Sequence, residues 1–73
     1  MFWLTYKNGK DVEVYIVQAR HIMEARMRAQ VRGQEGDFQE GHEVGEKSRL
    51  IPDSFIGRTL CTKEAEALLK RLG

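Results

Sequence analysis

The side chains best suited to chemistry in this sequence are one cysteine and two histidines. Cys61, His21 and His42 are the only soft metal ligands, and no two of them are near neighbours in the chain. Zinc sites that can be recognised in a sequence pair their ligands about two to four residues apart. A nucleophilic pair of Cys61 with His42 would also need an orienting group and an oxyanion cradle in a pocket. A chain of 73 residues has little volume to shape such a pocket. We therefore predict no catalytic residue, no metal site and no enzyme activity.

Carboxylates and glycines also lack the spacing of an ion or nucleotide site. The acidic residues between positions 35 and 43 do not follow the Asp-x-Asp-x-Asp-Gly pattern of a calcium loop. No glycine-rich loop runs into Lys-Ser or Lys-Thr, as a phosphate-binding loop does. We therefore expect no cofactor.

Two groups of side chains remain as candidates for binding a macromolecule. Trp3 and Tyr15 fall on the otherwise polar face of a predicted hairpin, and an exposed aromatic pair is a typical anchor for a partner. We expect them to bind another protein or a second copy of the chain, although a helix covering that face would explain the pair equally well. The alternative is an accessory role in nucleic-acid binding by Arg20, Arg28 and Arg32 of the first predicted helix. On a helical wheel Arg28 and Arg32 share one edge, whereas Arg20 points elsewhere.

The start of the chain predicts an antiparallel β-hairpin from residues 2–6 and 11–17. A two-residue Asn-Gly turn would mix apolar and polar residues on each face. A three-residue loop that ends with Gly9 in the left-handed region sets Leu4 opposite Val12 instead. Since this register gathers the apolar residues on one side, we predict the three-residue loop.

Two helices and a connecting segment follow. The first helix is expected from Gln18 to about Arg32, with Gly33 as its stop. Its predicted apolar face consists of Ala19, Ile22, Met23, Ala25 and Ala29. Residues 34–47 are rich in glycine and acid without clean periodicity, so we expect a long acidic loop. A short third strand joining the hairpin is expected near Ser48–Ile51, because a structureless loop of this length is uncommon in a compact domain.

The last third of the chain predicts a turn and a capped amphipathic helix. Thr62 is a suitable N-cap, Glu64 lies near the positive end of the helix dipole, and Gly73 can end the helix. The predicted buried face consists of Ala65, Leu68, Leu69 and Leu72.

Residues 51–69 resemble the short repeat found at the C-terminus of some bacterial topoisomerases. The matching positions are Pro52, Ile56, Gly57, Arg58, Leu60, Glu64, Ala65, Leu68 and Leu69. These are turn and helix-packing positions, so the resemblance implies a similar turn–helix unit and a nucleic-acid setting, but no catalytic residue. The chain as a whole looks like small bacterial proteins of unknown function, from which no activity can be carried over.

The length predicts a single small domain spanning residues 1–73, and the order of the expected elements predicts an α+β fold with two α-helices on one face of the hairpin sheet. The shares of 41% hydrophobic and 32% charged residues are ordinary for a folded globular chain. No apolar run approaches the roughly 20 residues of a membrane span, and Met1–Tyr6 lacks the basic start of a secretory signal. We therefore expect no membrane contact. One cysteine leaves no internal disulfide, which fits the reducing cytoplasm.

The net charge of +1 conceals an uneven distribution along the sequence. Residues 34–46 carry five acids and no base, whereas the segments on either side each carry an excess of three bases. A nucleic-acid-binding protein usually has an overall basic excess. The charge therefore favours a protein partner. A core this small gains from self-association, so that partner is another protein or a homodimer mate.

Overall fold

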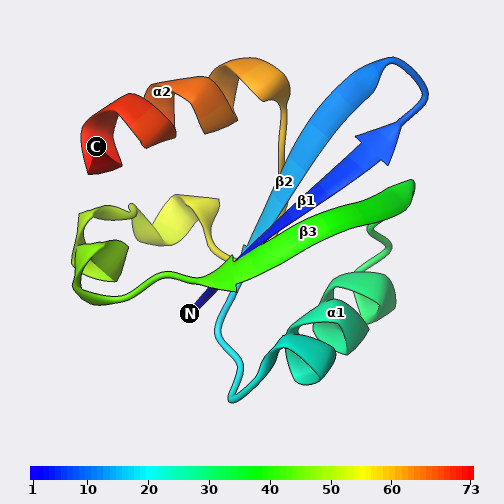
Figure 1. The fold of residues 1–73 in the computed structure, drawn as a ribbon, viewed down its shortest axis with the longest axis horizontal. Helices are drawn as coiled ribbons and strands as arrows, with labels where there is room; N and C mark the ends of the chain where they lie inside the picture. Colours follow the sequence, from blue (N-terminus) through cyan, green and yellow to red (C-terminus); the bar gives the residue numbers. More distant parts are fainter.

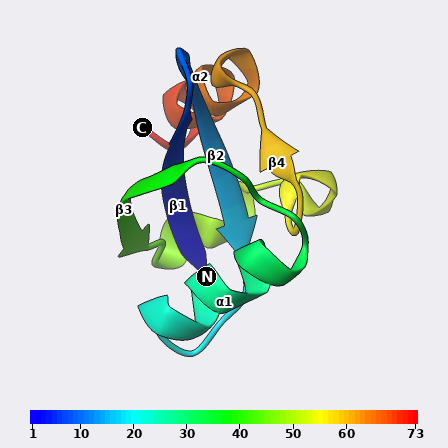
Figure 2. The same ribbon diagram turned by 90° about the vertical axis from the view of Figure 1, so that its right-hand side faces the viewer.

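The computed structural model describes residues 1–73 and contains one four-stranded antiparallel sheet with an α-helix on each side (Figure 1). The strand order is β3-β1-β2-β4, and Figure 2 shows β3 and β4 at the two edges. The strands are β1 (Phe2–Asn8), β2 (Asp11–Val17), β3 (Asp37–Glu43) and β4 (Thr59–Leu60). The helices are α1 (Ile22–Val31) and α2 (Thr62–Leu72), and two short 3₁₀ turns cover Glu46–Leu50 and Asp53–Phe55. The predicted α+β fold class is confirmed.

Both faces of the central β1–β2 hairpin are buried. On one face α1 packs through Ala25 and Ala29, and on the other α2 packs through Ala65 and Leu68. The strand residues under α1 are Phe2, Leu4, Tyr6, Tyr15 and Val17, and those on the α2 side are Trp3, Val14, Ile16 and Leu60. The prediction that both helices share one face is wrong. Four consecutive apolar side chains in β2 point alternately to the two faces, so a single covered face would leave two of them in water.

The hairpin has a two-residue turn, not the predicted three-residue loop. Asn8 pairs with Asp11 across Gly9 and Lys10, and the φ of Gly9 is +65°. A glycine with positive φ at the first central position is the arrangement of a II′ turn, whose twist matches that of the strands. Leu4 consequently lies opposite Tyr15 instead of Val12. The prediction assumed one buried face, but with two buried faces burial no longer selects that register.

The stretch predicted as an acidic loop, residues 34–47, contains the edge strand β3. The third strand expected at Ser48–Ile51 is absent there, because a 3₁₀ turn occupies most of that segment. Strand β3 is held by its backbone pairing with β1, and only Phe38 and Gly41 on it are partly buried. An edge strand of this kind has no apolar alternation, which explains why sequence periodicity does not reveal it.

Glycine at position 41 allows β3 to pass beneath α1. A Cβ atom built on Gly41 would lie 2.6 Å from the Cδ1 of Ile22 and 2.8 Å from the Cδ2 of Leu4. Leu4 is completely buried and cannot easily move aside. The space between β1, β3 and α1 is therefore filled at this residue.

Both helices begin at residues that the sequence did not predict. His21 caps α1, and its Nδ1 accepts a hydrogen bond from the backbone N–H of Glu24 at 3.3 Å. Cys61 occupies the N-cap position of α2, while the hydroxyl of Thr62 donates to the carbonyl of Val12 at 2.7 Å. The predicted stops are confirmed: Gly33 follows α1 with a φ of +89°, and Gly73 caps α2.

The buried side of α2 is narrower than the sequence suggested. Ala65 and Leu68 are buried, as expected, whereas Leu69 is 52% exposed. Leu72 is partly buried and packs against the core on the α2 side.

An ion pair joins the turn before β4 to the start of α2. The Arg58 guanidinium contacts both carboxylate oxygens of Glu64, at 2.7 and 3.4 Å, and also donates to the carbonyl of Ser54 at 2.8 Å. The same carboxylate accepts from the backbone N–H of Cys61 at 3.2 Å. The hydrogen bonds from Arg58 and from the backbone lower the pKa of Glu64 to about 2.

We expect this ion pair to make stability depend on pH in the acid range. The folded pKa of about 2 lies below the ordinary value of 4.5, so protonation favours the unfolded chain. The contribution of Glu64 is fully present above pH 4.5 and is lost as the pH falls toward 2. Carboxyl ¹³C NMR titration should find the low pKa in the parent and a raised pKa in Arg58→Met. An identical midpoint in both proteins would contradict the assignment.

Replacing Gly41 tests the close passage of β3 under α1. Valine has a higher strand propensity than glycine, so propensity alone predicts that Gly41→Val stabilises the protein. We expect a loss of about 1–3 kcal/mol instead, because the added methyl groups collide with Ile22 and Leu4. The control is Glu43→Val, two residues along the same strand and exposed. Equal stability of the two variants in urea unfolding would show that the space is open.

Candidate functional site

Trp3 and Tyr15, the residues predicted to anchor a partner, are buried. Their exposed fractions are 4% and 2%, and they lie on opposite faces of the sheet. Trp3 pairs with Ile16 on the α2 side, whereas Tyr15 pairs with Leu4 under α1. The prediction that they lie exposed and side by side is wrong, because it depended on the wrong register and on one open face. Both side chains belong to the core.

The residues considered for metal or nucleophilic chemistry lie apart. His42 is on β3 and stacks on Trp3 with ring centroids 6.3 Å apart, while Cys61 follows β4 at the other edge of the sheet. His21 caps α1. No group of three His, Cys, Asp or Glu side chains comes together to hold a metal ion.

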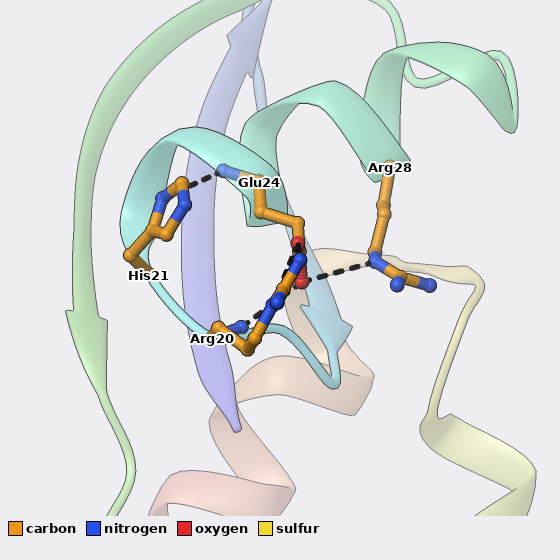
Figure 3. A network of polar contacts seen from close by, with 4 residues as sticks. All are labelled: Arg20, His21, Glu24 and Arg28. Carbon is orange, nitrogen blue, oxygen red and sulfur yellow. Dashed lines mark hydrogen bonds and ion pairs between the residues drawn. The ribbon is translucent and has the colours of Figure 1, made fainter.

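Two of the three arginines proposed for nucleic acid share a single carboxylate (Figure 3). Arg20 donates through its backbone N–H at 3.0 Å and through its guanidinium at 3.1 Å to Glu24. The Nε of Arg28 lies 3.6 Å from Glu24 Oε1, the oxygen that also accepts from the backbone N–H of Arg20. The backbone and side-chain hydrogen bonds from Arg20, followed by the charges of Arg20 and Arg28, lower the pKa of Glu24. Arg32, at the C-cap of α1, forms no ion pair.

The outer side of α1 carries an exposed apolar stripe, which the sequence reasoning missed. Met23, Met27 and Val31 are 59%, 64% and 85% exposed. They are four residues apart, so they lie on one side of the helix, and the buried Ala25 and Ala29 lie on the other. Met23 was predicted to be core, and that prediction is wrong. The spacing of the two alanines could have identified the buried side.

A hollow of about 540 Å³ lies beside this stripe, between α1, β2 and the turn at Gly57. Its lining residues are Tyr15, Val17, His21, Glu24, Met27, Arg28, Val31, Arg32 and Gly57. We call the hollow and the stripe of Met23, Met27 and Val31 together the α1 surface. The surface therefore combines an apolar centre with a rim that contains two arginines.

Hydrogen bonds to β2 hold one wall of the hollow in place. The Tyr15 hydroxyl donates to the carbonyl of Gly57 at 3.0 Å, and the backbone N–H of Gly57 donates to the carbonyl of Ile16 at 2.7 Å. Burial raises the pKa of Tyr15, and the positive charge of Arg32 partly opposes that rise. Tyr15 and Arg32 both line the hollow, and the charge of Arg32 acts on the Tyr15 phenol.

Comparison with protein-family models, with curated proteins and with solved structures found no significant match. The resemblance of residues 51–69 to the topoisomerase repeat therefore stays a prediction. Neither helix has the length and apolar character needed to cross a bilayer.

The wall of the hollow can be tested through the Tyr15 hydroxyl. In Tyr15→Phe the bond to Gly57 is lost, and we expect the unfolding free energy to fall by about 0.5–1.5 kcal/mol. The amide of Gly57 should also exchange with solvent faster, because its turn is held by one bond fewer. The matched control is Tyr6→Phe, since Tyr6 is buried on the same face but its hydroxyl donates to no protein group. If both variants behave alike, the Tyr15 bond does not hold the wall.

Proposed function

We propose that this chain is a small, non-catalytic protein-interaction module that binds its partner through the α1 surface. The observation that carries the proposal is the exposure of Met23, Met27 and Val31 in a row on one helix. Contiguous exposed apolar side chains with a polar rim are typical of interaction sites. Methionine is common at such sites, because its flexible, polarisable side chain adapts to a partner.

The charges around the stripe favour a different protein over a second copy of this chain. If two α1 helices packed antiparallel about a two-fold axis at Met27, Arg28 of each copy would approach Arg28 of the other. Like charges facing each other are destabilising. A homodimer through this surface is therefore the less favourable arrangement.

Nucleic-acid binding is the alternative that the arginines suggested. It has less support, because only Arg28 and Arg32 line the hollow, whereas Arg20 lies outside it and is paired with Glu24. The apolar stripe would also contribute little to binding a phosphate backbone.

The exposed free thiol of Cys61 supports a reducing, cytoplasmic setting for the module.

Site-specific photo-crosslinking in the native cell tests the proposal. A benzophenone amino acid replaces Met27 in the α1 surface, and in a matched control it replaces the exposed Lys70 of α2. We expect one protein to crosslink at position 27 and not at position 70. With that partner purified, Met27→Asp should weaken binding by about tenfold or more while changing the unfolding free energy by less than about 0.5 kcal/mol.

Three results would contradict the proposal. Crosslinks that are the same at both positions would show that α1 is not a specific surface. Adducts with a second copy of the chain would assign the surface to a homodimer. Adducts with nucleic acid would support the alternative, and the purified protein should then lose its binding to that nucleic acid steeply as salt is raised.

A further inference from the structure

The shape of the α1 surface limits what can occupy it. The backbone groups of α1 are bonded within the helix, so an added strand would find no main-chain partner there. Met23 and Val31 are eight residues apart, about 12 Å along the helix axis. A row of side chains of this length is a ridge, and ridges of one helix pack into grooves of another.

The hollow beside the ridge can receive large side chains. The hollow has a volume of about 540 Å³ and lies between Met27 and Val31 on one side and Gly57 on the other. Tyr15 and Val17 lie among the residues that line it. Large apolar side chains that fill such hollows are typical anchors of a protein partner.

The arginines of α1 indicate which charge a partner carries beside its apolar side chains. Residues 20–32 carry four arginines and one glutamate, and that glutamate already pairs with Arg20 and Arg28. Arg28 and Arg32 both line the hollow, and Arg32 has no carboxylate partner. Carboxylates of a partner could bind these guanidinium groups with two parallel hydrogen bonds each.

We infer that the α1 surface binds an acidic amphipathic helix, whose apolar side chains pack on the stripe and hollow and whose Asp or Glu side chains pair with Arg28 and Arg32. The inference rests on the proposed function and adds the chemistry of the partner. An extended segment would find no backbone groups on α1 with which to form hydrogen bonds. A basic segment would be repelled by Arg28 and Arg32.

A display selection on the purified full chain tests the inference. The probe is a library of random peptides of about 15 residues, long enough for four helical turns. Binders to a Met27→Asp, Val31→Asp variant are removed first. We expect the peptides that remain to carry apolar residues at i, i+3, i+4 and i+7 and an excess of Asp and Glu.

Charge exchange then tests the arginine contacts. In Arg28→Glu with Arg32→Glu, an enriched peptide should bind about tenfold or more weakly, and changing its acidic residues to lysine should restore affinity. The matched control, Lys63→Glu with Lys70→Glu on α2, should change the affinity less than about threefold. Circular dichroism and urea unfolding establish that each variant is folded.

The outcomes separate the two proposals. If no enriched peptide distinguishes the parent from the α1 variant, the α1 surface does not bind and both proposals fail. If peptides depend on the α1 surface but are basic, or alternate with period two, the proposed function stands and the acidic helix is wrong. Failure of the charge exchange to restore binding would also overturn the inference.

Discussion

The double-sided burial of the β1–β2 hairpin is the constraint on which the rest of this structure depends. Val14, Tyr15, Ile16 and Val17 follow one another in β2, and all four are buried. Because successive strand residues point to opposite faces, each face needs its own cover. In 73 residues that cover is one helix on each side, and both helices pack mainly through alanines and a single leucine. The core therefore consists of two thin apolar layers that share one sheet.

The way in which α1 covers its face explains why the chain exposes apolar surface elsewhere. Ala25 and Ala29 are short, so α1 lies close to the sheet, and its larger apolar side chains at 23, 27 and 31 face away. One edge of the sheet is β3, which carries Asp37, Glu40 and Glu43 and a register shift in its pairing with β1. Charges and irregular pairing on an edge strand discourage further strand pairing. Strand β3 therefore discourages pairing with a strand of another chain, whereas the apolar stripe on α1 has no comparable protection from contact with a partner.

The sequence predicted the elements better than their arrangement. The hairpin, both helices and their glycine stops follow from local patterns, and the structure contains them. The register, the strand β3 and the opposite placement of the helices depend on packing between distant segments, which no local pattern encodes. Trp3 and Tyr15 were assigned to a binding site because one face was assumed to be open. The α1 surface was missed because Met23, being apolar, was placed on the same face as Ala25 and Ala29, which the structure buries on the other side of the helix.

The central claim of this account is that α1 turns Ala25 and Ala29 toward the sheet and Met23, Met27 and Val31 toward solvent. Methyl NMR with a soluble paramagnetic agent measures this orientation directly. We expect the agent to broaden the methyl signals of Met23, Met27 and Val31 strongly. The methyl signals of Ala25 and Ala29 should stay sharp, because both residues are completely buried. Protected methionine methyls together with broadened alanine methyls would place the stripe in the core and contradict the account.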